Sequence, residues 1–198
     1  MKYLLIIVPL LVLTTSTVAQ TDPALRDELL KMREADQRAR AACQGTSDEQ
    51  LKCLAETLEK VDKPNTARIN EIYGRSGFPT AETVGKDGVE AFLLILQHSP
   101  DEQLRRKNLK NVGKAFRRRE ITPMEYAGYV DRVRVRRNKP QLYGSNFDMK
   151  EGRLVMSAVK DRRNLNRRRR KLGLPTIEEY AAKLREVYKL EVVVPPAK

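Results

Sequence analysis

His98 is the single histidine of the chain, so any acid–base mechanism that uses an imidazole must use this residue. Histidine exchanges a proton near neutral pH, and a neighbouring carboxylate commonly orients such a group. Asp131 or Asp62 is the candidate for that role, and Arg132 would bind an anionic substrate. A histidine that follows an apolar segment also has a plainer interpretation as a helix cap, because the helix dipole favours a cation there. Both interpretations remain open from spacing alone.

Further polar residues are candidates for a ligand site around His98. Gln97 can both donate and accept hydrogen bonds. Gln141 and Tyr143 alternate on an extended segment, so their side chains are expected to face the same way. Asn65 completes the set, although Asn65 and Asp62 are also ordinary turn and cap residues.

The composition excludes several kinds of site. One histidine and two cysteines are too few for the usual zinc site with four Cys or His ligands. The sequence has no glycine-rich phosphate loop, no H-E-x-x-H, no G-x-S-x-G and no nucleotide-binding fingerprint. We therefore predict neither a metal nor a cofactor, and no named reaction.

Helices are expected to position these residues, because apolar residues recur at helical spacing along most of the chain. Asp22-Pro23, Ser99-Pro100 and Thr122-Pro123 each combine a capping residue with a proline at the first helical position. We expect helices near residues 23–42, 48–60, 66–73, 89–97, 100–118, 123–133, 159–172 and 177–190. Residues 62–65 are expected to end one helix before the next begins, and residues 74–85 are expected to form a loop.

The predicted fold is mostly α, a single irregular helical bundle with a minor β-hairpin around residues 141–156. Residues 141–144 and 153–156 flank a polar stretch and are the expected strands of that hairpin. The sequence has no internal repeat and no second hydrophobic unit. Residues 20–190 are therefore expected to form one domain, and residues 191–198 a C-terminal tail.

The first nineteen residues match a secretory signal peptide. Lys2 precedes an apolar run over residues 3–13, and small residues lead to a cleavage site after Ala19. A membrane-spanning helix needs about 20 apolar residues, which is roughly twice the length of this run. We expect an exported protein, periplasmic or extracellular, with no transmembrane segment in the mature chain.

Export changes the interpretation of Cys43 and Cys53. In an oxidising compartment, two cysteines ten residues apart favour a disulfide over two buried free thiols. Gly45 and Ser47 between them are typical of a helix end and a new helix start. The predicted bond joins two helices close to their turn.

Charge is divided unevenly along the chain, whose net charge is +13. Residues 20–99 carry 11 basic and 14 acidic side chains, a net −3, whereas residues 100–198 carry 27 and 12, a net +15. A basic run, Arg167, Arg168, Arg169 and Arg170, is the candidate polyanion-binding site. Because the run lacks interleaved aromatic residues and the protein is expected to be exported, we predict an anionic ligand, lipid or polysaccharide as partner, not nucleic acid. A solvated basic face is the alternative.

Several short polar motifs follow one another in a fixed order. They are Asp62…Asn65-Thr66, Gly77-Phe78-Pro79, Gln97-His98-Ser99, Asp131-Arg132-Val133, Pro140-Gln141-Leu142-Tyr143-Gly144 and Arg169…Gly173-Leu174…Glu179-Tyr180. In this order they resemble a bacterial family known only as a domain of unknown function, over residues 25–185. Pro100 departs from the family pattern, which has an acid after the small residue that follows the histidine.

The resemblance implies relatives and not a reaction, since that family carries no established activity. It implies that Gln97, His98, Asp131, Arg132, Gln141 and Tyr143 form one constellation. Such a constellation is a ligand pocket, a hydrolase-like site or a buried structural network. The leading hypothesis is an exported helical domain that binds an anionic ligand or envelope component. The alternatives are a hydrolase-like enzyme using His98 and a purely structural or interaction protein.

Overall fold

The computed structural model describes residues 21–43 and 47–196 of the chain. The predicted signal peptide and the turn at Gly45 lie outside the described residues. The fold is mostly α with a small sheet, which confirms the predicted fold class. In the described part of the chain, no helix is both long enough and apolar enough to cross a membrane.

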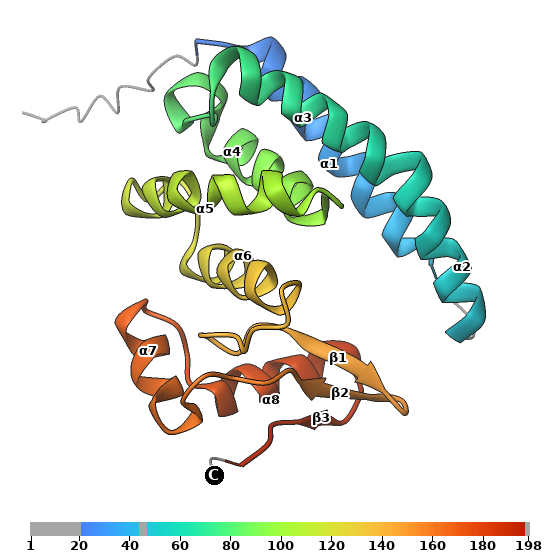
Figure 1. Ribbon diagram of the computed structural model, residues 1–198, viewed down its shortest axis with the longest axis vertical. Helices are drawn as coiled ribbons and strands as arrows, with labels where there is room; N and C mark the ends of the chain where they lie inside the picture. Colours follow the sequence, from blue (N-terminus) through green and yellow to red (C-terminus); the bar gives the residue numbers. More distant parts are fainter. Residues whose placement is uncertain (1–20, 44–46, 197–198) are drawn as a thin grey trace, which may run out of the picture.

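The described residues up to 135 are mostly helical. The helices are α1 (Pro23–Ala41), α2 (Ser47–Thr57), a π-helical turn (Leu58–Asp62), α3 (Lys63–Ser76), α4 (Ala81–His98), α5 (Glu102–Arg117) and α6 (Pro123–Val135). They are stacked in chain order, from α1 and α3 through α4 and α5 to α6 (Figure 1). The α1–α2 end projects beyond the rest of this stack.

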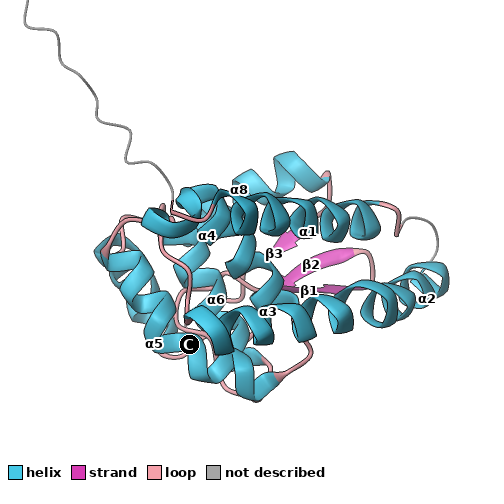
Figure 2. Ribbon diagram, turned by 90° about the horizontal axis from the view of Figure 1, so that it is seen from above, coloured by secondary structure: helices cyan, strands magenta, loops and turns pink. Residues whose placement is uncertain are grey.

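The last third holds the strands and the shorter helices. It contains β1 (Phe147–Lys150), β2 (Arg153–Met156), a 3-10 turn (Arg162–Asn164), α7 (Leu165–Lys171), α8 (Ile177–Tyr188) and β3 (Val192–Val193). Seen from above, helices make up most of the molecule and the short strands lie side by side (Figure 2).

The predicted helix starts are largely confirmed by their caps. The Leu25 N–H donates to the Asp22 carboxylate at 2.9 Å, and Thr122 forms a capping box with Glu125. Ser99 does not cap the fifth helix, because its hydroxyl accepts from the Asp101 N–H instead. Asp101 is the N-cap, and α5 begins at Glu102.

The predicted break at residues 62–65 is wrong. The π-helical turn leads from α2 directly into α3, with Pro64 in the first turn of α3. Pro64 has no N–H to donate, but the helix continues because the π-helical turn has already replaced the usual hydrogen-bond pattern, with the Lys63 N–H donating to the Leu58 carbonyl five residues back. The expected loop over 74–85 shrinks to residues 77–80 and a break at Gly85. Gly77, with φ +74°, ends α3, Thr80 caps α4, and Gly85 interrupts α4 with φ +71° and ψ +165°.

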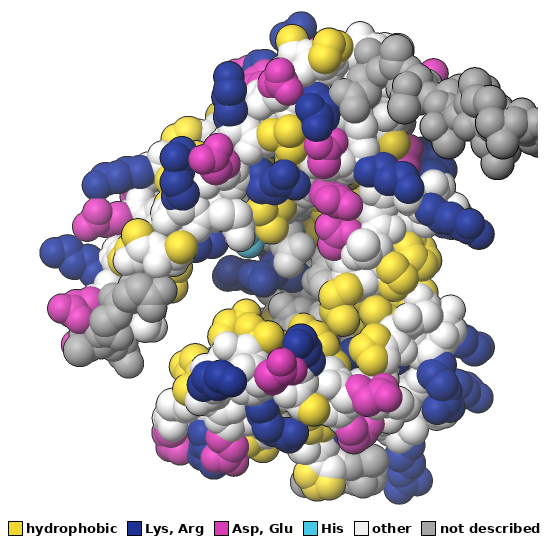
Figure 3. Space-filling view, turned by 180° about the vertical axis from the view of Figure 1, so that it is seen from behind, with side chains coloured by type: hydrophobic (Ala, Val, Ile, Leu, Met, Phe, Trp, Pro, Cys, Tyr) yellow, Lys and Arg dark blue, Asp and Glu magenta, His cyan; other side chains and the backbone are white. Residues whose placement is uncertain are grey.

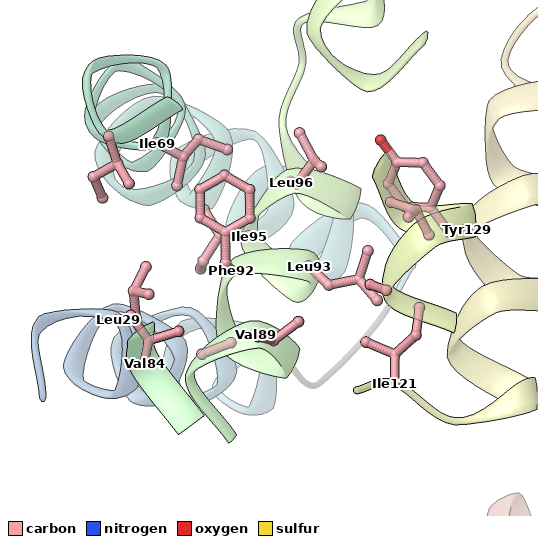
Figure 4. Close-up of a cluster of buried hydrophobic side chains, with 14 of the residues drawn as sticks. Leu29, Ile69, Val84, Val89, Phe92, Leu93, Ile95, Leu96, Ile121 and Tyr129 are labelled. Atoms are coloured by element: carbon pink, nitrogen blue, oxygen red, sulfur yellow. The ribbon is translucent and has the colours of Figure 1, made fainter. Parts of the chain in front are cut away.

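The main core surrounds α4, the most apolar helix. Leu29 of α1, Ile69 of α3 and Phe92 of α4 are fully buried, and Tyr129 of α6 closes the far side of the cluster. Figure 4 shows these side chains converging on the middle of α4 from the neighbouring helices. The apolar faces of α1, α3, α5 and α6 therefore pack on one central helix, and this fixes the position of His98 at its C-terminal end.

The hairpin is present, but one of its strands differs from the prediction. Residues 153–156 pair antiparallel with β1, in the register Phe147↔Met156, and not with residues 141–144. Gln141 instead forms an isolated bridge with Val159, and Gly144 has φ +69°, which ends any extended segment. The expected tail also contributes to the sheet, because β3 runs parallel to β2.

The Cys43–Cys53 disulfide is confirmed. The two Cα atoms are 5.4 Å apart, and the bond joins the residue after the C-cap of α1 to the middle of α2. It ties α2 to the end of α1.

Gly144 is expected to be the least replaceable glycine of the sheet region. A Cβ at this position would lie 3.1 Å from Ile177, 3.2 Å from Met156 and 3.3 Å from Leu165, the three buried residues of a second apolar cluster. Gly144→Ala is expected to cost about 2–3 kcal/mol, from the left-handed backbone together with overpacking. Gly152→Ala is the matched control, since Gly152 has φ +74° with open space around it and should cost about 1 kcal/mol. Urea unfolding of both variants checks this, and equal losses would contradict it.

Candidate basic cleft around His98

His98 is the last residue of α4, and its ring meets a carboxylate of α1. Its Nδ1 lies 2.9 and 3.0 Å from the two carboxylate oxygens of Asp36. The Nε of Arg40 lies 3.1 Å from Nδ1 but also 3.3 Å from each Asp36 oxygen. Because both oxygens are acceptors, we assign the Arg40 N–H and a proton on Nδ1 to the carboxylate. The other nitrogen, Nε2, then has no hydrogen-bond partner among the described residues.

Asp36 is the centre of a charged network. Its side chain is fully buried, and Arg40, one turn later on α1, donates to it at 3.1 Å and also to Asp62. Gln37 donates to the same carboxylate at 2.9 Å. Burial alone would raise the pKa of Asp36, but the hydrogen bonds from His98 and Arg40 outweigh burial and hold the pKa at about 2. Asp36 is therefore a permanent anion that orients His98.

Sequence reasoning missed Asp36 and Arg40, although a signal exists. Leu25, Leu29 and Met32 form an apolar stripe on the first helix, and Asp36 and Arg40 continue it at the same spacing. A carboxylate on the buried face of a helix needs a partner. The predicted orienting residue, Asp131, bonds elsewhere, and Asp62 reaches this network only through Arg40.

Arginines with unmatched charge lie next to this network. Arg105, on α5, is only 6% exposed, and its Nε–H has no acceptor in the described part of the protein. The Nε–H of Arg132 is likewise buried without an acceptor. Burial lowers the pKa of Arg105, and the positive charge of Arg136 lowers it further. Burial also lowers the pKa of Arg132, followed by the charges of Arg136, Arg40 and Arg105.

Arg105 and the Asp36 partners Arg40 and His98 line a cavity of about 350 Å³, which we call the basic cleft; Arg132 does not line it. Its lining residues are Arg40, Leu54, Leu58, Asp62, His98, Ser99, Pro100, Arg105 and Arg136. Figure 3 shows the molecule hollowed between the projecting helices and the sheet region, with the blue of Lys and Arg and the cyan of His inside the hollow. The arrangement suits an anion, because guanidinium groups bind carboxylates and phosphates through paired N–H donors.

The remaining residues of the Asp62 motif lie near the cleft without lining it. Asn65 and Thr66 follow Asp62 by three and four residues, which places them on the same helix face. The Asn65 amide nitrogen and the Thr66 hydroxyl are buried without hydrogen-bond partners among the described residues. Gln97 is half-buried beside His98.

Asp131, Gln141 and Tyr143 belong to a second network, which holds a loop. The Asp131 carboxylate accepts from the N–H groups of Leu142, Tyr143 and Ser145 and from the Ser145 hydroxyl. Burial raises the pKa of Asp131, and these hydrogen bonds oppose that rise. The expected constellation is therefore divided: His98 lies in the cleft with Arg132 close by, whereas Asp131 fixes the 142–145 loop.

Gln141 holds the other side of the same loop. Its side chain is fully buried, donates to the carbonyls of Asn146 and Ser157, and accepts from the Asn146 N–H at 2.9 Å. Such complete bonding of a buried amide is what a structural residue requires. Tyr143 contributes its backbone, whose carbonyl accepts from Arg169 at 2.6 Å.

The basic run on α7 is only half exposed. Arg169 is fully buried, where it donates to the carbonyls of Tyr143 and Pro175 and lies 5.0 Å from the centre of the Tyr180 ring. Arg168 donates to the Leu142 carbonyl. Polyanion binding by this run stays a prediction, and it now rests on the exposed Arg167 and Arg170.

The fold and the cleft together define a small, mostly helical domain with a basic cavity. The chain belongs to DUF6624, a family of unknown function, which matches residues 23–193. No curated protein and no solved structure matches the chain.

Asp36→Asn is expected to change how stability depends on pH. The folded pKa of about 2 lies below the ordinary 3.8, so the carboxylate contributes about 2 kcal/mol that is present above pH 4 and is lost as the pH falls towards 2. The variant is expected to be less stable at pH 7, because Arg40 and His98 lose an anionic partner, and to lose less stability between pH 5 and pH 2. Urea unfolding at pH 7, 5, 3 and 2 measures both effects.

Glu34→Gln provides the control for this experiment. Glu34 is an exposed carboxylate on the same helix, with only Arg38 at 3.4 Å as an ion-pair partner. Its replacement should leave the acid dependence unchanged. Identical pH profiles for the wild type and Asp36→Asn would contradict the assignment of Asp36 as the acid-sensitive group.

Proposed function

We propose that this protein is an exported domain that binds a small anionic ligand in the basic cleft. Export rests on the predicted signal peptide and agrees with the Cys43–Cys53 disulfide. The observation that carries the binding proposal is the side chain of Arg105, which is buried and lacks a hydrogen-bond acceptor for its Nε–H.

A buried arginine of this kind is unfavourable for the fold alone. Removing a guanidinium from water costs several kcal/mol unless an anion or a set of acceptors replaces the water. The buried charge of Asp36, in contrast, is compensated by His98 and Arg40. No carboxylate within ion-pair distance serves Arg105 in the described residues. The positive charge of Arg136 acts against that of Arg105, and the more distant charges of Glu102 and Asp101 offset this only in part. An anionic ligand would supply the negative charge and the hydrogen-bond acceptors that Arg105 and Arg136 lack.

The network around Asp36 gives the cleft a fixed wall. Arg40 is held by Asp36 and Asp62, so its charge is already neutralised. His98 is held by Asp36 on the same side. The charge left for a ligand is therefore that of Arg105 and Arg136, whose charges also lower the pKa of the nearby Arg132. A ligand that carries one phosphate or one carboxylate matches this charge.

Arg105→Met is expected to abolish anion binding while it stabilises the fold. The wild type should show a saturable rise in melting temperature with inorganic phosphate at constant ionic strength, as expected for a ligand that binds only the folded state. Arg105→Met should lose this saturable rise. The variant without ligand should be about 1 kcal/mol more stable than the wild type, because the methionine keeps the apolar stem and removes the unpaired buried charge.

Arg106→Met is the matched control. Arg106 is the next residue of α5 and is exposed, so its replacement removes the same charge from the chain outside the cleft. It should retain the saturable effect of phosphate. If phosphate acted equally on the wild type, Arg105→Met and Arg106→Met, its effect would be general screening of a basic protein, and the proposed site would be wrong.

A second candidate function is acid–base catalysis by His98 in the same cleft. The observation that favours it is the pairing of Nδ1 with Asp36, which leaves Nε2 as the free nitrogen of a lining residue. A carboxylate in this position keeps the ring in the tautomer that can take up a proton at Nε2.

His98→Gln tests the catalytic candidate. With 4-nitrophenyl phosphate and 4-nitrophenyl acetate as probes, a catalytic His98 predicts hydrolysis by the wild type that falls about 100-fold or more in the variant. The phosphate-induced rise in melting temperature should persist in His98→Gln, which shows that the cleft is intact. Hydrolysis no faster in the wild type than in the variant would leave His98 as a structural partner of Asp36.

A further inference from the structure

We infer that the ligand of the basic cleft is a small amphiphilic anion, whose charged head lies at Arg105 and whose apolar part lies against α2. This inference rests on the proposed function and specifies the class of ligand. Two features carry it: the leucines that form one wall of the cleft, and the order in which charge and apolar surface follow one another from the inside of the cleft to its mouth.

The apolar wall comes from the α2 side of the cleft. Leu54 and Leu58 line the cavity together with the arginines. With Leu51 they recur at a spacing of three and four residues, which places all three on one face of the helix. Such a stripe normally packs into a core, yet Leu51 is 66% exposed and Leu54 43% exposed. Nothing in the described part of the protein covers this face.

The polarity of the cleft is the reverse of the usual one. Binding sites generally have an apolar interior and a polar rim. Here the most buried charged residues of the lining are Arg105 and Asp62, at 6% and 7% exposure, and Asp62 is already paired with Arg40, whereas Leu54 in the apolar wall is 43% exposed. A ligand that satisfies both regions must enter with its anionic head first and leave its apolar part along the leucines.

This order also separates a single ligand molecule from a membrane surface. Exposed leucines beside arginines are typical of membrane-binding surfaces, where the basic side chains contact lipid headgroups from outside. Arg105 is too deeply buried to contact a flat surface. A cavity of about 350 Å³ is instead in the size range of pockets that take one small molecule.

The length of the leucine stripe sets the useful length of the apolar part. At 1.5 Å per residue, the stripe from Leu51 to Leu58 extends for roughly 10 Å along the helix. An alkyl chain of medium length would therefore remain in contact with leucine side chains over its whole length. Each methylene that is fully buried strengthens binding about three- to fourfold, and a half-buried one about twofold.

The test is a series of phosphate monoesters with the same head and different chains. Methyl, butyl and octyl phosphate are titrated by calorimetry, each below the concentration at which it forms micelles. The affinity is expected to rise by about tenfold or more from butyl to octyl phosphate. Octanoate is titrated beside octyl phosphate, and the tighter of the two identifies the head as carboxylate or phosphate.

Leu54→Ser and Val187→Ser form the matched pair of variants. Both replace an exposed apolar side chain, but Val187 lies on α8 and does not line the cleft. Leu54→Ser should weaken octyl phosphate binding several-fold and leave methyl phosphate binding unchanged. Val187→Ser should change neither.

The possible failures are distinguishable. If methyl and octyl phosphate bind equally well and both need Arg105, the amphiphile inference is overturned and the anion-binding function stands. If octyl phosphate still binds to Arg105→Met with undiminished affinity, both are overturned. If the protein binds vesicles of anionic phospholipid but not octyl phosphate, the apolar face is a membrane contact and the inference is overturned.

Discussion

The carboxylate of Asp36 is the interaction on which the helical part of the molecule depends. It is fully buried at the point where α1 passes the end of α4, and His98 and Arg40 satisfy it from two sides. Arg40 extends the same network to Asp62 at the start of α3. One buried anion thereby joins three helices whose apolar faces alone would allow some sliding, since hydrophobic contact is not directional. The network is at once a structural junction and one wall of the basic cleft.

Buried charges in this protein fall into two groups with different physical meanings. Asp36 and Asp131 are surrounded by hydrogen-bond partners and fix the helices and the 142–145 loop, respectively. Arg169 donates to two carbonyls and fixes the α7–α8 region, although its Nη2 is buried without an acceptor. Arg105 and Arg132 each bury a donor without an acceptor. A fold tolerates the first group because each hydrogen bond offsets the loss of water. The second group weakens the fold and is expected at sites that act on something other than the chain itself.

The sequence predicts most of the helices, because caps and apolar spacing are local signals. Asp22 and Thr122 cap helices where expected, and the cysteine pair joins as expected. The candidate site was predicted only in part, because Asp36 and His98 are 62 residues apart and no local rule pairs them. Asp131 was paired with His98 on the basis of residue type, but it bonds to backbone N–H groups eleven to fourteen residues away. The prediction of residues 141–144 as a hairpin strand is wrong for a similar reason. The buried Gln141 side chain donates to the backbone carbonyls of Asn146 and Ser157 and so holds this segment as a loop. Hydrogen bonds from side chains to backbone groups far away in the sequence determine the role of Asp131 and the loop at Gln141. Composition and apolar periodicity do not predict such bonds.

The disulfide makes the leucine-lined wall dependent on the oxidation of Cys43 and Cys53. Cys43 and Cys53 tie α2 to the end of α1, and α2 carries Leu54 into the cleft wall. Without that bond, the α1–α2 connection is a longer unconstrained loop with more conformations to lose on ordering. A chain with reduced cysteines is therefore expected to hold its arginines in place with a looser apolar wall beside them. Formation of the disulfide completes the wall, so the shape of the cleft depends on the oxidation of two cysteines that do not line it.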